Sequence, residues 1–417
     1  MSVTPRVAEY GASLSWERVP EAVREKTRAS LLDALACAAA GRKTAEFAAL
    51  ERTLALAGER GAGSRALLDA FAVHVLEYDD AHKRSKTHPG AVVVPAVLQT
   101  AALAGAPAHR QLAAIVAGYE IMLRLGIALG AAEHRRAGWH ATATTGAIGA
   151  AVAAARVLDL DADGIAQAMG HAVGLASGNW AFLAGDSDTK AFQVANAARA
   201  GVLSALAAQN GLRAATHALE ARDGGFFALF GGDANDALRD LDRFLMPEVA
   251  TKPYPCCRTV QAGIDAVFAL RPIDGPIHVK TFGICVEQNG FYSDGAAGQA
   301  AFSLPLIIAA AARDGRVDFE TFSPATVASL REAERNVTWE VDSALDAMYP
   351  EKWAATVVAG GRTKTVEYAL GDPLNPMDER AYARKLEACA GSDGAALRAQ
   401  VDSLFTTADS ELAVSSI

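Results

Sequence analysis

Apolar positions in the first 248 residues recur at helical spacing, with short polar interruptions. The spacing predicts helices at 21–41, 91–104, 110–131, 141–158 and 190–210. Gly41 and Asn210-Gly211 are suited to end the first and the last of these. Asp161 and Asp163 are candidate caps for a further helix. The N-terminal part of the chain is therefore expected to be all-helical.

Two of these segments are expected at the centre of the helical core. The 91–104 segment is apolar on nearly every side, which is typical of a buried helix. The 141–158 segment consists largely of Ala, Gly and Thr. Small residues let helix backbones approach closely, so other helices are expected to pack tightly against this segment.

The pattern changes after Pro247. A helix is expected at about 258–270, and alternating positions predict strands at 276–286 and 337–341. Two β-rich runs at 353–368 flank Gly360-Gly361, which predicts a hairpin. The 377–404 segment returns to a helical pattern. We therefore expect a mainly α protein: a helical domain at 1–248, an α+β lid domain at 249–376, and residues 377–417 packing back onto the helical domain.

Composition and charge narrow the class of protein. Hydrophobic residues make up 51% of the 417 residues, ample for a large core, and apolar runs such as 301–312 are too short to cross a membrane. The N-terminal segment lacks a secretory pattern, and the five cysteines contain no zinc-type CxxC pair, which favours a reduced cytoplasm. The net charge of −9 argues against nucleic-acid binding. A local basic cluster can still bind an anionic substrate.

The segment 77–90, EYDDAHKRSKTHPG, concentrates charged residues between two apolar helices. A solvated loop is the ordinary explanation of such a run. Here, however, His88-Pro89-Gly90 opens a buried helix, whose N-terminus favours anions, and a histidine there can act as acid or base. The two acids and two histidines also make the segment a metal candidate, although their spacing fits no standard zinc motif.

Three further positions are candidates for chemistry. His140 follows Gly138-Trp139 at a helix start, where a satisfied core histidine is equally common, and Lys190 opens an Ala-rich helix, where a surface cation is the ordinary case. The stretch 251–258, TKPYPCCR, places Lys252 and Arg258 at the expected domain junction, a favoured place for ligand sites. Its two cysteines are better explained as structural than as thiolate nucleophiles. The absence of GxSxG, P-loop and GxGxxG motifs leaves serine-hydrolase, ATP and nicotinamide chemistry without support.

Taken together and in order, these segments resemble the MmgE/PrpD family. The motifs are Asp79-Asp80…His88-Pro89, Gly138-Trp139-His140, Lys190 before an Ala-rich helix, and Lys252-Pro253-Tyr254-Pro255-Cys256. The resemblance extends over nearly the whole chain. Its specificity lies in the order and spacing of the motifs, since each motif alone is weak.

The resemblance implies a helical domain with a lid, a homodimer, and an enzyme without metal or organic cofactor. The family includes 2-methylcitrate dehydratase, cis-aconitate decarboxylase and iminodisuccinate epimerase, which share proton transfer at a carbon next to a carboxylate. This chemistry needs a base, an acid, and cations that hold the carboxylates. The expected catalytic residues are His88, His140, Lys190 and Asp79, and the expected substrate-binding residues are Lys252, Asp80, Arg258 and Lys86.

Three departures from the family pattern affect the expected reaction. The loop 81–86 is unusually basic, Leu306 stands where the decarboxylases have a tyrosine, and Gln193 replaces a usual histidine. A dehydratase acting on a citrate-like polycarboxylate is the first expectation, with an epimerase or a decarboxylase as alternatives. Outside this chemistry, a non-catalytic carboxylate-binding protein and a metal-dependent hydrolase stay open.

Overall fold

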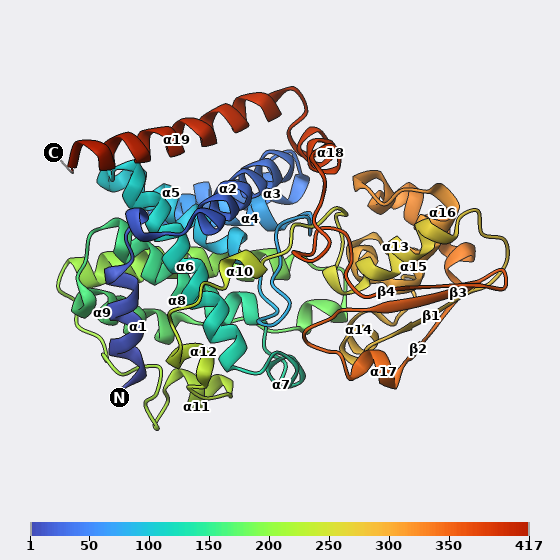
Figure 1. Cartoon of the computed structure of the whole chain (residues 1–417), viewed down its shortest axis with the longest axis horizontal. Helices are drawn as coiled ribbons and strands as arrows, with labels where there is room; N and C mark the ends of the chain where they lie inside the picture. The colour runs from blue at the N-terminus through green and yellow to red at the C-terminus, as the bar shows by residue number, and fades with distance from the viewer. Residues whose placement is uncertain (1, 416–417) are drawn as a thin grey trace.

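Residues 2–415 are described by the computed structural model, and they form a large helical part and a smaller part that contains the sheet (Figure 1). About 63% of the structure is helical, as the sequence predicts. The helices of the first part are α1 Val3–Ser13, α2 Glu21–Gly41, α3 Ala45–Leu56, α4 Ala62–His74, α5 Pro89–Ala104, α6 Ala108–Ala128, α7 Ala131–Arg136, α8 Ala141–Val157, α9 Ala162–Leu175, α10 Thr189–Gln209, α11 Phe226–Phe230 and α12 Asp236–Arg239.

Helix α8 is the centre of the helical part, because every residue from Ala141 to Ala155 is buried. It packs against α6 and α10, and α10 also packs against α4. A Cβ atom at Gly201 of α10 would lie 2.3 Å from the Cβ of Ala150, so the two backbones approach too closely for any larger residue. The prediction of a small-residue core helix is confirmed. The same packing brings the ends of α4 and α10, which carry His74 and Lys190, to one place.

Helix α6 is long and apolar enough to cross a membrane by length and composition alone. However, 89% of its most apolar stretch is buried inside the protein. Helix α6 packs against α5, α8 and the C-terminal helix, so its apolar surface is covered by neighbouring helices. Its composition is that expected of a core helix.

The lid domain contains a four-stranded sheet in the order β2-β1-β3-β4. Strands β1 and β2 are parallel, with Ile277 paired to Val337, and the other two pairs are antiparallel. The predicted hairpin is confirmed: Ala359 pairs with Arg362 across Gly360-Gly361, and both glycines have positive φ, as a tight two-residue turn requires. The elements are α13 Gln261–Leu270, β1 Ile277–Thr281, α14 Gly283–Asn289, α15 Leu304–Asp314, α16 Pro324–Glu334, β2 Val337–Val341, α17 Ser343–Asp346, β3 Ala355–Ala359 and β4 Arg362–Val366.

Three details differ from the sequence prediction. The strand expected at 276–286 ends at Thr281, where the pairing with β2 also ends, and residues 283–289 form α14 because a short apolar run suits a strand or a buried helix equally. The helix expected at 377–404 is two helices, separated at Gly391, which has a φ of 55°. Residues 211–248 hold only short helices among turns.

The two C-terminal helices, α18 Glu379–Ala390 and α19 Gly394–Ser415, lie along the helical part (Figure 1). Helix α18 contacts α2, and α19 contacts α2 and α6. Leu386, Val401 and Phe405 are buried in the core of the helical part. The lid has a separate core, so the site described below lies where two independently packed bodies meet. The domain limits at 248 and 376 stay predictions.

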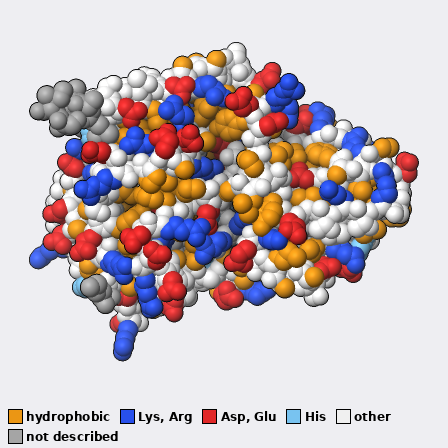
Figure 2. Space-filling model, in the orientation of Figure 1, with side chains coloured by type: hydrophobic (Ala, Val, Ile, Leu, Met, Phe, Trp, Pro, Cys, Tyr) orange, Lys and Arg blue, Asp and Glu red, His pale blue; other side chains and the backbone are white. Residues whose placement is uncertain are grey.

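Basic and acidic side chains are interspersed over the face drawn in Figure 2, on the helical part and on the lid. This face therefore offers no continuous basic stripe of the kind that binds nucleic acid.

Candidate active site

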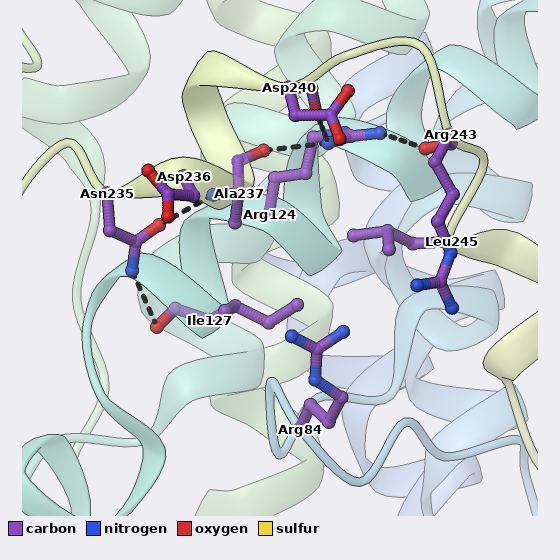
Figure 3. A pocket seen from close by; sticks show the side chains of 9 residues that line it. All are labelled: Arg84, Arg124, Ile127, Asn235, Asp236, Ala237, Asp240, Arg243 and Leu245. Atoms are coloured by element: carbon purple, nitrogen blue, oxygen red, sulfur yellow. Dashed lines mark hydrogen bonds between the residues drawn. The ribbon is translucent and has the colours of Figure 1, made fainter.

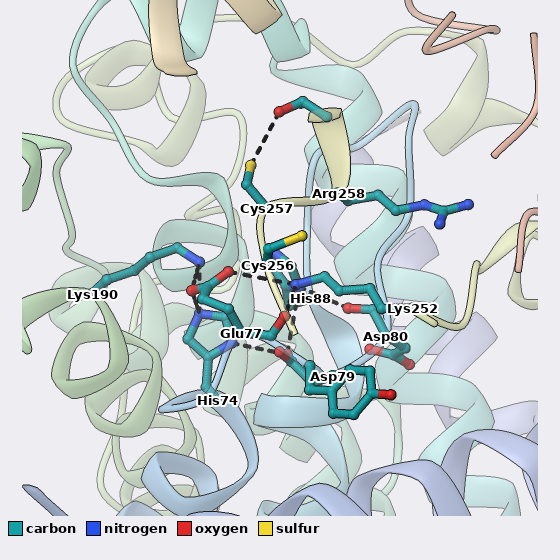
Figure 4. A network of polar contacts seen from close by, with 12 residues as sticks. His74, Glu77, Asp79, Asp80, His88, Lys190, Lys252, Cys256, Cys257 and Arg258 are labelled. Carbon is teal, nitrogen blue, oxygen red and sulfur yellow. Dashed lines mark hydrogen bonds and ion pairs between the residues drawn. The ribbon is translucent and has the colours of Figure 1, made fainter. Parts of the chain in front are cut away.

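Four segments that are distant in sequence meet at the junction of the two domains. They are the loop 77–88 between α4 and α5, the start of α8, the start of α10, and the segment 251–259 that leads into the lid. Pro89 begins α5 directly after His88, so this helix fixes the end of the loop. Figure 4 shows Lys190, His74 and Lys252 around the Glu77 carboxylate.

Glu77 contacts both Lys190 and Lys252, the two lysines that the family resemblance assigns to the site. Its carboxylate forms an ion pair with Lys190 and lies 3.5 Å from the Lys252 ammonium, which also donates a hydrogen bond of 2.7 Å to the Glu77 carbonyl. Burial alone would raise the pKa of the Glu77 carboxyl, but the charges of Lys190 and Lys252 outweigh burial and hold this pKa well below its usual range. Glu77 is therefore an internal counterion for two buried cations.

His74 is a residue of this cluster that the sequence analysis missed. It is fully buried at the end of α4, its Nδ1 lies 2.8 Å from the Asp79 carboxylate, and its Nε2 lies 3.0 Å from the Lys190 ammonium. A charged lysine can only donate, so Nε2 accepts and Nδ1 carries the proton that bonds Asp79. A histidine in the last helical turn before a charged loop was the only sequence signal for it.

Asp79 orients His74 more directly than His88. The distance from its carboxylate to His88 Nδ1 is 3.5 Å, whereas His88 Nδ1 lies 2.7 Å from the backbone carbonyl of Asp80. The carbonyl accepts, so Nδ1 of His88 carries the proton and Nε2 keeps its lone pair. This tautomer suits a base whose free nitrogen faces a substrate.

His88 and His140 both line the cavity at the junction. Burial lowers the pKa of each imidazole well below 6.5, and nearby cations lower it further: Lys252 and Lys190 for His88, and Lys190 for His140. Nδ1 of His140 is buried with no hydrogen-bond partner among the described residues. Two neutral imidazoles therefore lie beside two lysines in one site.

The cavity itself is narrow. Its volume is about 30 Å³, room for roughly two water molecules, so a carboxylate ligand enters only if the walls move apart. Both domains line it. The lining residues are Glu77, Ala81, His82, Lys86, Thr87, His88, His140, Trp180, Lys190, Cys257, Arg258, Thr259, Gln288, Phe302 and Trp353.

Two residues predicted to bind substrate are engaged elsewhere. Asp80 does not line the cavity; its carboxylate accepts from the Gly90 amide at 2.9 Å and from the Tyr119 hydroxyl at 2.8 Å, and so caps α5. Arg258 lines the cavity, but its guanidinium donates to Gln261 and to the carbonyls of residues 369 and 370, and it points away from Glu77 (Figure 4). Asp80 therefore fixes the 77–88 loop to the start of α5, and Arg258 fixes the backbone of the lid at residues 369 and 370.

Comparison with known proteins agrees with this architecture. The model of the MmgE/PrpD N-terminal domain matches residues 5–237, and that of the MmgE/PrpD C-terminal domain matches residues 254–407. The chain belongs to the MmgE/PrpD family. The family's C-terminal domain thus includes α18 and most of α19, which pack on the helical part.

Two proteins that are similar to this MmgE/PrpD chain come from Aspergillus fungi. A cis-aconitate decarboxylase of Aspergillus terreus is 27% identical over 292 residues, which cover 64% of this chain and 59% of that protein. A cis-aconitate decarboxylase-like protein of Aspergillus oryzae is 28% identical over 249 residues, 55% of this chain and 51% of that protein. The chain therefore spans little more than half the length of these relatives. Membership supports an enzyme of the dehydratase or decarboxylase type.

The two family departures at Leu306 and Gln193 have different surroundings. Leu306 is fully buried in the lid core and does not line the cavity, so the lid presents no hydroxyl from this position. Gln193 accepts a hydrogen bond from the Asn179 amide at 3.0 Å, and Asn179 pairs with Trp139 beside His140. The Gln193 side chain also hydrogen-bonds the His140 imidazole, so the residue that replaces the usual histidine contacts the site directly.

A metal ion would find one group of ligands in this MmgE/PrpD site. One donor atom each from His74, Asp79 and His88 lies within 4.8 Å of the others. However, the ammonium of Lys190 already bonds His74, and Lys252 carries a second positive charge beside Glu77. Glu77 and Asp79 offset the charges of these two lysines, but a metal would have to displace Lys190 from His74 and the proton that Asp79 holds on the same ring. The ligand atoms of this group are therefore already engaged by other residues of the site.

The basic loop 81–86 distributes its charges over three different surroundings. Lys83 forms an ion pair of 2.6 Å with Asp372 of the lid, and Arg84 lies 3.4 Å from Glu248. Arg84 reaches a hollow of about 340 Å³ on the helical part, where the guanidinium of Arg124 is occupied by backbone carbonyls (Figure 3). Only Lys86 of these three lines the cavity at the junction.

Proposed function

We propose that this chain transfers a proton at a carbon next to a carboxylate of a small di- or tricarboxylate, as a hydro-lyase similar to 2-methylcitrate dehydratase. The observation that supports the proposal is that two neutral histidines, His88 and His140, line one interdomain cavity together with Lys190, while Lys252 is buried beside Glu77 in the same cluster. The proposal needs no cofactor for its acid–base steps.

In the proposed reaction the lysines stabilise negative charge, and the neutral histidines transfer the proton. A proton on the carbon next to a carboxylate is weakly acidic, and its removal places negative charge on that carboxylate. Lys190 and Lys252 stabilise this charge by facing it in a water-poor site. One imidazole takes the proton while the C–H bond breaks. The imidazolium formed in this way then gives its proton to the leaving hydroxyl as the C–O bond breaks, so that a C=C bond and a water molecule form.

A decarboxylase is the second candidate, because the curated relatives are named as cis-aconitate decarboxylases. In that reaction a C–C bond to a carboxylate breaks, and the site must then protonate the carbon left behind. The buried Leu306 offers no proton donor at the position where the decarboxylases have a tyrosine. An epimerase, which returns a proton to the same carbon, needs the same two imidazoles and stays an alternative.

Incubation of the purified protein in D2O with 2-methylcitrate, citrate, cis-aconitate and iminodisuccinate, each followed by proton NMR, tests the proposal. We expect a vinyl signal to appear from a hydroxy acid, because removal of water creates a C=C bond. Loss of carbon dioxide from cis-aconitate would instead indicate a decarboxylase. Deuterium entry into iminodisuccinate without net conversion would indicate an epimerase.

The same incubation with EDTA tests the cofactor-free assignment. We expect equal rates with and without the chelator, since the proposed steps use only side chains. Loss of activity with EDTA, restored by a divalent metal, would contradict the assignment. It would indicate that His74, Asp79 and His88 bind a metal ion. If wild-type protein leaves all four compounds unchanged and binds none of them, the proposed substrate class is wrong.

The pH profile of the reaction is a further expected result. A base must be neutral to accept a proton, and both His88 and His140 have a pKa well below 6.5. As pH falls, these imidazoles stay neutral through 6.5 and become protonated only in more acid solution. The acidic limb of kcat/KM, corrected for ionisation of the substrate, should therefore lie below pH 6.5. A limb above pH 6.5 would contradict the assignment of either histidine as base.

A further inference from the structure

Lys86 stands at a fixed position in the wall of the cavity. The loop around it is closed by hydrogen bonds from the His82 amide to the Thr87 carbonyl, at 2.9 Å, and between the Ser85 and Thr87 hydroxyls, at 2.6 Å. The Lys86 amide donates to the Lys83 carbonyl at 3.2 Å. These contacts form a tight turn that positions the Lys86 backbone before any ligand binds.

The turn holds Lys86 with an unfavourable backbone conformation and a buried, unpaired side-chain nitrogen. The residue has a φ of 55°, a region that residues other than glycine seldom adopt. Its ammonium nitrogen is buried and has no hydrogen-bond partner among the described residues; it lies 5.5 Å from the centre of the Trp180 ring, within the range of a cation–π contact. Burial lowers the pKa of the Lys86 ammonium to about 7. An unpaired buried amine and a strained backbone are both costs that commonly mark functional positions.

Lys86 and Lys190 both line the cavity but have different neighbours. The ionisable groups that act on the Lys86 ammonium are Cys257, Arg135, Cys285 and Glu287. By contrast, Lys190 contacts Glu77 and His74. The neighbours of Lys86 thus come from the lid and from α7, not from the Glu77 cluster. The cavity is therefore lined by two lysines that belong to two separate sets of polar groups.

Gln288 adds an unpaired acceptor to the lining of the same cavity. Its side-chain nitrogen donates to Cys257 at 3.1 Å, and its carbonyl oxygen is buried with no partner among the described residues. Both Gln288 and Lys86 line the cavity. A buried donor and a buried acceptor that face the same space and lack partners are complementary to a ligand with polar groups at that place.

We propose that Lys86 and Gln288 form a second subsite, which binds a second carboxylate of the substrate through Lys86 and a neighbouring hydroxyl through the Gln288 carbonyl. This inference rests on the proposed function, since it assumes that the first carboxylate lies at Lys190 and Lys252. The subsite selects polycarboxylates over acids with a single carboxylate. Lys86 is a specificity-determining residue in this arrangement.

Binding of a substrate analogue that cannot react tests the subsite separately from catalysis. Tricarballylate is a saturated tricarboxylate without a leaving group, and its terminal monoamide has the same size with one negative charge fewer. We expect wild-type protein to bind tricarballylate roughly 10-fold more tightly by titration calorimetry, the effect of one charge-assisted hydrogen bond. In Lys86→Met this ratio should fall to about 1, and in Lys86→Arg, which keeps the charge, it should persist.

Lys83→Met is the matched control, because Lys83 belongs to the same loop but pairs with Asp372 outside the cavity. It should keep the wild-type ratio. Lys86→Met should unfold at the same or a higher temperature than wild type, since it removes an unpaired buried charge; a lower temperature would assign Lys86 to the fold and overturn the subsite. An unchanged ratio in Lys86→Met overturns the subsite alone. A wild-type protein that binds neither compound overturns the proposed function as well.

Discussion

His88→Ala is expected to reduce kcat by about 10²- to 10⁴-fold, the usual contribution of a positioned acid or base. His88 lines the cavity with its Nδ1 proton held by the Asp80 carbonyl, which leaves Nε2 as the nitrogen that can accept a substrate proton. Removing the imidazole removes this group while the loop keeps its other hydrogen bonds, such as the Gly90 amide to Asp80. The loss should therefore appear in kcat, measured by the vinyl signal in NMR.

His171→Ala is a suitable control for this experiment. His171 lies on α9 outside the cavity, where its Nε2 is 2.9 Å from the Leu212 carbonyl. It should keep wild-type activity. The circular dichroism spectrum of His88→Ala should match that of wild type, so that lost activity reflects lost chemistry. Wild-type turnover in a folded His88→Ala protein would remove His88 from the proposed mechanism.

Lys190→Met is expected to abolish measurable turnover and to weaken binding of tricarballylate. Lys190 is the cation closest to both Glu77 and His74, and the proposed reaction needs it to stabilise charge on the substrate carboxylate. Its removal also leaves His74 without the donor at 3.0 Å. Because Glu77 keeps Lys252 as a partner, the free energy of unfolding should fall by only roughly 1–3 kcal/mol, and the protein should stay folded.

Two further variants define what the Lys190 result means. Lys364→Met changes an exposed lysine of β4 and should leave turnover and unfolding unchanged. Lys190→Arg keeps the positive charge but changes its shape, so partial retention of ligand binding with low kcat would indicate a positioning requirement. If Lys190→Met turns over substrate at the wild-type rate, Lys190 acts only as a partner of Glu77 in the fold.

The elements that local pattern determines were predictable from sequence. The Gly360-Gly361 hairpin depends on two residues that accept positive φ, and the buried helix α8 depends on its own run of small residues. The strand expected beyond Thr281 failed because the apolar run Ile284 to Val286 suits either structure, and contact with other elements decides between them.

The site was predictable only as far as its segments could be recognised. His88, His140, Lys190 and Lys252 converge as the resemblance implies, although their roles stay predictions. The partners were not predictable: His74 lies in a helix that looks ordinary, and the function of Glu77 as a shared counterion needs α4, α10 and the 251–259 segment to be packed together. Likewise, nothing in the sequence distinguishes Asp79, which bonds His74, from Asp80, which caps α5.

The carboxylate of Glu77 has a consequence for which cellular acids can use this site. It is tethered beside Lys190 and Lys252, so it competes with any incoming anion at a high effective concentration. A monocarboxylate such as acetate offers only one charge in competition with the Glu77 carboxylate. Monocarboxylates should therefore bind weakly in this site, even where they are abundant in the cell. A polyanion gains a second point of attachment, which the tethered carboxylate cannot match. We therefore expect that only an anion with two or more carboxylates displaces the Glu77 carboxylate from Lys190 and Lys252.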